Sequence, residues 1–475
     1  MPTYDLIVIG AGPVGENVAD YAHREGMSTV IVESQLVGGE CSYWACMPSK
    51  ALLRPEAARR AALHVDGAKE AVTGGLDVAA VLKRRDAMVS NYDDSGQVSW
   101  LDSAGIDLVR GFARITGVKQ VTVTQPDGAE TVLTANHAVA VSTGSTALVP
   151  DIPGLAESSP WTSREATGAE QVPASLVIIG GGVVGCEMAT AYTSLGCSVT
   201  LVARGGLLGG MEAFAGELVA DSLTESGATL KLGVSPTTVS RDDSGVTVQF
   251  DDGTSVTAEH VLAATGRRPN TVDFGLASVG LTDGEWLDVD DTLLVKADTN
   301  DGDPWLYGVG DVNHRALLTH QGKYQARAAG RVIAARAKGQ TLDDGRWGRH
   351  VATADARSVP QVTFTDPEAS AIGLTEQQAK DAGLTVRAPE YDLAAVSGSS
   401  VYDDSYVGRA KLVIDAERDV VVGATFVGRD IGELLQSATI AVVGEVPIQR
   451  LWHAVPSYPT ISEVWLRLLE TDGVA

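Results

Sequence analysis

The stretch Tyr4-Asp-Leu-Ile-Val-Ile-Gly-Ala-Gly-Pro-Val-Gly15 decides the fold of the first part of this chain. Its apolar residues Tyr4–Ile9 predict a short, buried strand of a parallel sheet. The three glycines that follow have the spacing of a dinucleotide-binding turn. Gly10 makes the turn, Gly12 lets a pyrophosphate approach the backbone, and Gly15 lets the next helix pack on the strand. The stretch therefore predicts a nucleotide-binding βαβ unit.

The residues after this turn complete the unit. We expect a helix up to about Gly26 and then a strand over Ser28–Val32 that ends at Glu33. Glu33 stands 21 residues after Gly12, where a carboxylate accepts the hydroxyl groups of an adenosine ribose. A glycine pattern alone is weak evidence, and the strand, the helix and the acid supply the context that a binding site needs.

A second unit of the same kind follows later in the chain. Its core is Val177-Ile-Ile-Gly-Gly-Gly-Val-Val-Gly-Cys-Glu187, and a strand is expected over Ser198–Val202. The glycines that match the first turn are Gly180, Gly182 and Gly185. Two such turns predict one bound dinucleotide in each unit, which suits a protein that passes electrons between two nucleotides.

The two units differ at the end of their second strand. Where the first unit has Glu33, the second has Ala203-Arg204. A carboxylate at this place favours NAD, whereas a neutral residue followed by arginine accommodates the extra phosphate of NADP. We therefore expect NADPH, with NADH as the other candidate. The alternative explanation of Arg204 is an ordinary solvated surface charge.

Two cysteines, Cys41 and Cys46, lie shortly after the first unit. Residues five apart on an ideal helix have Cα atoms about 8 Å apart, whereas a disulfide needs about 4.4–6.8 Å. The backbone must therefore be distorted if the two sulfurs bond, and Pro48 offers a reason, because it cannot donate to the carbonyl of Trp44. A helix start also stabilises a thiolate. Such a pair in an intracellular α/β enzyme indicates redox or metal chemistry, and the alternative is two unrelated buried thiols.

Length, charge and cysteine content set further limits. With 475 residues the chain exceeds one core, and we expect about three domains. A net charge of −25 argues against nucleic acid or an anionic membrane as a partner. The chain enters a strand at once, which leaves no room for a signal peptide, and no apolar run reaches the roughly 18 residues that span a bilayer. Cys186 and Cys197 are expected in the core. We therefore expect a cytoplasmic protein and predict no metal site.

Several segments together resemble the flavin-dependent pyridine nucleotide–disulfide oxidoreductases, such as dihydrolipoamide dehydrogenase, glutathione reductase and mercuric reductase. The segments are Gly10–Gly15, Gly39–Lys50, Thr143–Gly144, Gly180–Glu187, Thr265–Asn270, Gly308–Asp311, Phe364–Ala369 and Tyr458–Glu463. The resemblance covers essentially the whole chain. It implies an α/β fold with two Rossmann-like dinucleotide-binding domains and a C-terminal α+β dimerisation domain.

The expected domain boundaries follow from these motifs. An FAD-binding domain would occupy residues 1–150 and 273–345, an NAD(P)-binding domain residues 151–272, and the dimerisation domain residues 346–475. Within the first domain, alternating apolar and polar residues from Asp107 to Thr146 predict antiparallel strands.

The resemblance also implies which residues hold the cofactors. FAD would have Glu33 on its adenosine ribose, Asp311 on its ribityl chain and Ala113 near its adenine. Lys50 and Glu187 are expected as an ion pair beside the reactive edge of the flavin. The other residues expected at the two cofactors are Gly10, Gly12, Gly15, Gly39, Thr143, Gly144, Thr319, Gly180, Gly182, Gly185, Arg204 and Gly266.

The catalytic residues implied by the resemblance include one departure from the family. Cys41 and Cys46 would form a redox disulfide, with Cys46 nearer the flavin and Cys41 attacking the substrate. The histidine base of the disulfide reductases is replaced by Tyr458, while the glutamate that holds it is present as Glu463. A phenol with a pKa near 10 is a poor base at neutral pH. Tyr458 therefore either takes part as a hydrogen-bond donor or only shapes the pocket, and His453 is out of register to replace the base.

The expected function is that of a homodimeric FAD-dependent NAD(P)H oxidoreductase that passes reducing equivalents through Cys41–Cys46 to a small disulfide or dithiol. The tyrosine and Ala203-Arg204 are similar to mercuric reductase, but no cysteine pair near the C-terminus is present to deliver mercury. Two alternatives stay open. The first is reduction of a quinone, another electrophile or a metal ion directly by the flavin, and the second is a redox-sensing flavoprotein without turnover.

Overall fold

The computed structural model describes residues 2–300 and 302–473. These residues form two compact units, each built from three stretches of the chain. Unit 1 comprises residues 1–48, 86–148 and 266–356, and unit 2 comprises residues 49–85, 149–265 and 357–475. Residues 49–85, expected in the first domain, group with unit 2. The expected domain boundaries stay predictions.

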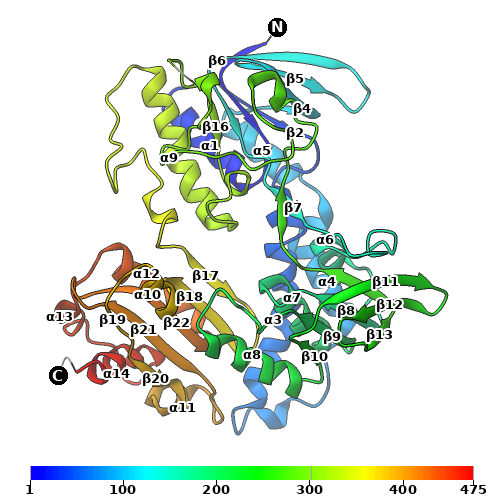
Figure 1. Cartoon of the computed structure of the whole chain (residues 1–475), viewed down its shortest axis with the longest axis vertical. Helices are drawn as coiled ribbons and strands as arrows, with labels where there is room; N and C mark the ends of the chain where they lie inside the picture. Colours follow the sequence, from blue (N-terminus) through cyan, green and yellow to red (C-terminus); the bar gives the residue numbers. More distant parts are fainter. Residues whose placement is uncertain (1, 301, 474–475) are drawn as a thin grey trace. The chain divides into compact units, whose positions relative to one another are not determined.

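Unit 1 is built around a seven-stranded sheet (Figure 1). Its strands are β1 (Thr3–Ile9), β2 (Thr29–Glu33), β3 (Asp107–Arg110), β4 (Phe112–Gly117), β5 (Gln120–Thr124), β6 (Glu130–Val141) and β16 (Leu306–Gly308). Parallel pairing joins β3 to β2, β2 to β1, β1 to β6, and β6 to β16. This is the parallel arrangement that the first glycine turn predicts.

Strand β6 takes part in two kinds of pairing. Its last residues pair in parallel with β1 and β16, while its first residues, Glu130–Thr134, pair antiparallel with β5. Strand β5 pairs antiparallel with β4 in turn. The antiparallel prediction is therefore right for β4, β5 and the start of β6. It is wrong for β3, which is parallel to β2, because an alternating pattern shows which side chains are buried but not the strand direction.

Two long helices cover this sheet and contact each other closely. They are α1 (Pro13–Arg24) and α9 (Thr319–Ala337). A Cβ atom on Gly330 would lie only 2.7 Å from Cβ of Tyr21 and 3.0 Å from the carbonyl oxygen of Val18, so the two helices meet at a glycine. The other elements of unit 1 are α2 (Gly39–Tyr43), α5 (Ser95–Ser103) and the paired strands β7 (Ser145–Ala147) and β15 (Arg267–Pro269). Helices α3 (Cys46–Leu63) and α4 (Val78–Met88) carry residues of both units.

The first part of unit 2 repeats the βαβ pattern. A four-stranded parallel sheet has the order β10-β9-β8-β14, and a separate antiparallel sheet has the order β11-β12-β13. The strands are β8 (Ser175–Ile179), β9 (Ser198–Ala203), β10 (Thr229–Leu232), β11 (Pro236–Asp242), β12 (Gly245–Phe250), β13 (Ser255–Ala258) and β14 (His260–Ala263). The helices are α6 (Ser163–Gly168), α7 (Val183–Ser194) and α8 (Ala213–Glu225). Cys186 and Cys197 are buried in the core of this part, as expected.

The second part of unit 2 is an antiparallel sheet with helices, the expected α+β arrangement. Its strand order is β17-β18-β22-β21-β19, and β20 also pairs with β21. The strands are β17 (Pro360–Thr363), β18 (Glu368–Gly373), β19 (Val386–Arg387), β20 (Glu390–Asp392), β21 (Arg409–Asp415) and β22 (Val420–Gly428). The helices are α10 (Glu376–Asp381), α11 (Ser397–Tyr402), α12 (Leu435–Val443), α13 (Ile448–Leu451) and α14 (Val464–Thr471). Throughout the part of the chain that the structure describes, every helix is too short or too polar to cross a membrane.

The glycine turn of unit 2 gives a direct test of the fold. A Cβ atom on Gly185 would lie 1.9 Å from the carbonyl oxygen of Gly180, whereas one on Gly182 would have no heavy atom within 4 Å. Gly185→Ala should therefore force α7 away from β8 and lower the stability of the chain by at least about 2 kcal/mol. Gly182→Ala is the matched control, and it should lower the stability by much less, about 0.5 kcal/mol. Thermal unfolding without nucleotide measures both, and equal losses would contradict the packing role of Gly185.

Candidate functional site

The first glycine turn leaves a space above the start of α1. Gly10 has φ +101°, and a Cβ atom there would lie 2.5 Å from the carbonyl oxygen of Ser142. At Gly15 a Cβ atom would lie 1.8 Å from the carbonyl oxygen of Gly10. Gly12 is different, because a Cβ atom there would meet only Cα of Gly39, at 4.0 Å, among the described residues. The structure thus brings Gly12 and Gly39 together and leaves the backbone of Gly12 accessible to a ligand.

Glu33 lies at the end of β2 with its carboxylate fixed by backbone donors. Oε2 accepts a hydrogen bond from the N–H of Ala11 at 2.7 Å, and Oε1 accepts one from the N–H of Gln35 at 2.7 Å. Each carboxylate oxygen can accept a further hydrogen bond. The orientation therefore suits the predicted role as an acceptor for ribose hydroxyl groups.

Three buried polar atoms in this region lack a hydrogen-bond partner among the described residues. They are Oγ of Ser142, Oγ1 of Thr143 and Oε1 of Glu16. Burial raises the pKa of Glu16 to about 7. Buried polar atoms normally have partners, and a dinucleotide carries hydroxyl and phosphate groups that can provide them. The open glycine turn and these atoms therefore fit a bound dinucleotide such as FAD.

Asp311 follows β16 and is held from the side by a serine. Oγ of Ser145 donates to Oδ2 of Asp311 at 2.6 Å, and Nε of Arg267 donates to the same Oγ at 2.5 Å. Burial raises the pKa of Asp311, while Ser145 and Arg267 act in the opposite direction. The predicted residues Thr143 and Gly144 are next to this group in the chain, and Nδ2 of Asn270 donates to the carbonyl of Thr143 at 2.9 Å.

Cys41 and Cys46 belong to two different helices. Cys41 lies in α2, the chain leaves helical geometry at Trp44 (φ −135°, ψ 5°), and Cys46 is the first residue of α3. The helix is therefore interrupted between the cysteines, as a bond between their sulfurs would require. The interruption lies at Trp44, before Pro48, which is the third residue of α3. Sγ of Cys46 lies 3.5 Å from Oγ1 of Thr319, the first residue of α9. The structure thus brings together two residues that were expected at the site, Cys46 and Thr319.

The ring of Trp44, between the two cysteines, packs against other aromatic rings. It lies 6.3 Å from the ring of Tyr92 with 29° between their planes, and 5.6 Å from the ring of Tyr43. This contact gives Trp44 a packing role in unit 1.

The second glycine turn repeats the geometry of the first. Gly180 has φ +127°, and its missing Cβ atom leaves room for the carbonyl of Ala264, while Gly182 is open. Arg204 is exposed directly after β9. Gly266, also expected at a cofactor, has φ +137° and belongs to unit 1, where its carbonyl accepts from Leu148.

Lys50 and Glu187 form the expected ion pair within unit 2. Nζ of Lys50 lies 2.8 Å from Oε2 and 3.0 Å from Oε1 of Glu187, whose side chain is 4% exposed. The N–H of Phe364 also donates to Oε1 at 3.0 Å, and Nζ of Lys50 lies 4.7 Å above the Phe364 ring. Phe364 thus holds both members of the pair. The location of this pair beside a flavin stays a prediction.

Tyr458 and Glu463 differ strongly in exposure. Tyr458 is 75% exposed and follows α13, whereas Glu463 is buried. Oε1 of Glu463 accepts from Arg467 at 2.5 Å, and its Oε2 has no partner among the described residues. His453 is exposed. The carboxylate of Glu463 thus contacts α14, the helix that directly follows it, and the roles of both residues in catalysis stay predictions.

Four residues of these clusters are not among the site residues expected from the sequence, namely Glu16, Ser145, Arg267 and Phe364. Ser145 follows Thr143–Gly144, Arg267 follows Gly266, and Phe364 begins the Phe-Thr-Asp-Pro segment. Their positions next to motifs are thus the signal that could have found them. Ala113, expected near an adenine, is buried in β4, and the N–H of the nearby Gly111 donates to the carbonyl of Glu33 at 2.9 Å.

The ion pair of Lys50 yields a stability prediction. Lys50→Met leaves the buried carboxylate of Glu187 with the N–H of Phe364 as its remaining donor. After allowance for water that reaches Lys50, the expected loss is about 1–2 kcal/mol. The double variant Lys50→Met/Glu187→Gln should recover part of it, and Lys69→Met, which breaks an exposed pair with Asp66, is the control. Thermal unfolding measures all three, and equal effects of Lys50→Met and Lys69→Met would contradict the buried pair.

Comparison with known proteins supports the interpretation of the two glycine turns as dinucleotide-binding sites. The chain is 31% identical over 465 residues to mercuric reductase from Staphylococcus aureus, covering 97% of this chain and 81% of that protein. It is 32% identical over 474 residues to dihydrolipoyl dehydrogenase from Chlorobaculum tepidum, covering 97% of this chain and 95% of that protein. Among solved structures, the HOCl-induced flavoprotein disulfide reductase RclA from Escherichia coli in complex with Cu(II) has the same fold. Its TM-score is 0.82 at 22% identity, and 99% of each chain is covered.

Two family profiles match consecutive parts of the chain. The profile described as pyridine nucleotide-disulphide oxidoreductase matches residues 4–335, and the dimerisation domain of the same family matches residues 359–468. These matches confirm the family and the fold class that the motifs predict. The chain therefore belongs to the pyridine nucleotide-disulphide oxidoreductases, which are enzymes with FAD and NAD(P)H as their characteristic cofactors.

Proposed function

We propose that this chain is a homodimeric FAD-dependent NAD(P)H oxidoreductase that reduces a small disulfide through Cys41 and Cys46. The observation that carries this proposal is the contact of Cys46 Sγ with Thr319 Oγ1 at 3.5 Å. Thr319 begins the 19-residue helix α9, and Cys46 itself begins α3. Helix starts carry partial positive charge, which stabilises a thiolate. Cys46 therefore has the surroundings of a reactive thiol.

The chemistry assigns a separate task to each cysteine. FAD, when bound, supplies the two-electron transfer between the nicotinamide and the dithiol. Cys41, as a thiolate, attacks one sulfur of the substrate disulfide, forms a mixed disulfide and releases one thiol. Cys46 then attacks the sulfur of Cys41, which releases the second thiol and forms the Cys41–Cys46 bond. In total, NAD(P)H, one proton and one disulfide give NAD(P)⁺ and two thiols.

NADPH is the proposed reductant. The position that corresponds to Glu33, at the end of β9, is held by Ala203, and the exposed Arg204 follows directly. An arginine there can pair with the 2′-phosphate of NADP.

A homodimer is proposed because residues 359–468 match the dimerisation domain of the family. Large apolar side chains are exposed in this region, including Ile440, Val455 and Tyr458. Burial of such side chains against a second copy would stabilise the pair. A cytoplasmic location, and the absence of nucleic-acid and membrane partners, stay predictions from composition.

Tyr458 is the reason to keep a second candidate function. The phenol replaces the imidazole that would serve as the base for a thiol substrate, and it is 75% exposed. An enzyme that reduces a quinone, another electrophile or a metal ion directly from the flavin does not need this base.

Variants of the cysteines separate these functions. Cys41→Ser should lower disulfide turnover at least about 100-fold, because it removes the attacking thiol, while reduction of the flavin by NADPH continues. Cys197→Ala, in the core of unit 2, is the control. The measurement is steady-state oxidation of NADPH and NADH against a panel of disulfides, quinones and metal ions. Full activity of Cys41→Ser would favour reduction directly by the flavin, and no activity of the wild type with any acceptor would favour a redox sensor.

The replacement of histidine by Tyr458 gives a further test. Tyr458→His should raise turnover of dihydrolipoamide by about tenfold or more, because an imidazole exchanges protons near neutral pH. The pH profile should then gain an ionisation near pH 6.5. Tyr458→Phe is the control and should show no gain. If Tyr458→His behaves like Tyr458→Phe, the missing base does not separate this chain from the dihydrolipoamide dehydrogenases.

A further inference from the structure

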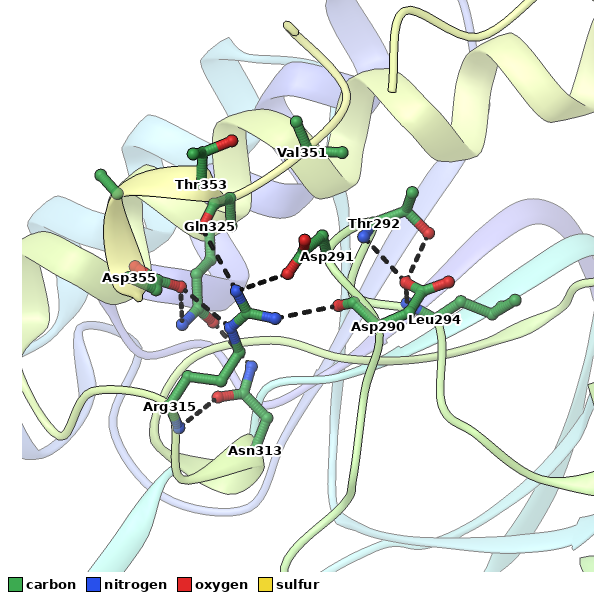
Figure 2. Close-up of polar contacts among 12 residues, drawn as sticks. Asp290, Asp291, Thr292, Leu294, Asn313, Arg315, Gln325, Val351, Thr353 and Asp355 are labelled. Carbon is green, nitrogen blue, oxygen red and sulfur yellow. Dashed lines mark hydrogen bonds and ion pairs between the residues drawn. The ribbon is translucent and has the colours of Figure 1, made fainter. Parts of the chain in front are cut away.

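A polar network in unit 1 links Arg315, Gln325 and Asp355 (Figure 2). Its centre is Asp355, the last residue of a short 3-10 turn (Thr353–Asp355), whose side chain is 0% exposed. Arg315 extends across the same region. Its guanidinium contacts the carbonyl of Asp290 at 3.2 Å, the carboxylate of Asp291 at 2.9 Å and Oδ2 of Asp355 at 3.4 Å. All of these residues belong to unit 1.

Asp355 accepts hydrogen bonds from two glutamines of helix α9. Nε2 of Gln321 donates to its Oδ1 at 2.7 Å, and Nε2 of Gln325 donates to its Oδ2 at 2.8 Å. Burial raises the pKa of Asp355 to about 6, against the effect of Gln325 and Arg315. The two amide donors and the Arg315 guanidinium that face the carboxylate favour its ionised form, which can only accept hydrogen bonds. Asp355 thus requires both glutamine amides to turn their NH₂ groups toward it.

This requirement fixes the other end of Gln325. The amide has one oxygen and one nitrogen, so the oxygen must point away from Asp355. Oε1 of Gln325 accepts from the N–H of Gly310 at 2.7 Å and from Nδ2 of Asn313 at 2.8 Å. Nδ2 of Asn313 also donates to the carbonyl of Gly308 at 2.9 Å. The turn before and after Asp311 is therefore bound to an amide whose orientation Asp355 determines.

The turn at Gly310, which Gln325 holds through these hydrogen bonds, has an unusual backbone conformation. Gly310 has φ +86° and ψ −153°, a backbone conformation that residues with a side chain rarely adopt. The next residue, Asp311, accepts from Ser145. The turn is thus bound both through Gln325, at Gly310 and Asn313, and through Ser145, at Asp311.

We infer that Asp355 is a positioning residue: through Gln325 it sets the turn that presents Asp311 to the ribityl chain of the flavin. The effect on the flavin rests on the proposed function, whereas the effect on the turn does not. A neutral asparagine at position 355 could donate as well as accept, so Gln325 could turn its NH₂ group toward Gly310. In that orientation the NH₂ group of Gln325 would face the N–H of Gly310, and two hydrogen-bond donors would oppose each other.

The test compares Asp355→Asn with Asp291→Asn. Both variants remove a carboxylate that contacts Arg315, but Asp291 is exposed, whereas Asp355 is buried and also accepts from Gln325. Hydrogen exchange of the segment 308–313, measured on the full-length chain, should accelerate at least tenfold in Asp355→Asn and less than twofold in Asp291→Asn. The rate of flavin release from the diluted holoenzyme, followed by fluorescence, should rise about tenfold in Asp355→Asn only.

A second pair of variants tests whether Asp355 acts through Gln325. Gln325→Met should reproduce both effects, while Gln321→Met, which removes a donor to Asp355 without a contact to Gly310, should not. The double variant Asp355→Asn/Gln325→Met should release flavin no faster than Gln325→Met, because the two residues act in series. Additive effects, or unchanged exchange of the segment 308–313 in Asp355→Asn, would overturn the inference. A wild-type chain that takes up no flavin would instead overturn the proposed function, and the exchange rates would still decide the role of Asp355.

Discussion

In both glycine turns, the carbonyl oxygen of the first glycine lies where the last glycine would carry a Cβ atom. The rest of each nucleotide-binding unit depends on this close approach of strand and helix. The carbonyl of Gly10 lies where a side chain at position 15 would begin, and the carbonyl of Gly180 lies where one at position 185 would begin. The contact sets how closely helix and strand approach. It also aims the N-terminal end of the helix, with its free N–H groups, at the space above Gly12 or Gly182. One absent atom thus determines where an anionic ligand can bind.

Around this frame, three carboxylates, of which Asp355 is buried and Glu33 and Asp311 are partly exposed, each have donors of a fixed kind. Backbone N–H groups hold Glu33, a serine hydroxyl holds Asp311, and two amides hold Asp355. A buried carboxylate without donors would be costly. With donors it is an acceptor of known direction. The site therefore obtains its geometry from groups that themselves do not react.

The sequence predicts features that depend on neighbours in the chain. The glycine spacings, Glu33 at the end of β2 and the helix interruption between Cys41 and Cys46 all follow from local geometry. Contacts between distant residues could not be predicted in this way. Phe364 reaches Glu187 across 177 positions, Ser145 reaches Asp311 across 166, and Asp355 reaches Gln325 through a turn that has no motif. The direction of β3 could not be predicted for the same reason, since a strand's partner is set by the tertiary fold.

The double pairing of strand β6 affects how the sheet of unit 1 can partly unfold. Its 12 residues supply the centre of the parallel sheet at one end and the edge of the antiparallel hairpins at the other. Because a single continuous backbone serves both, the hairpins cannot detach far without disturbing the strand that also holds β1 and β16. Partial unfolding should therefore be cooperative across the whole sheet, so that proteolytic nicking within the hairpins and loss of the nucleotide pocket become one event.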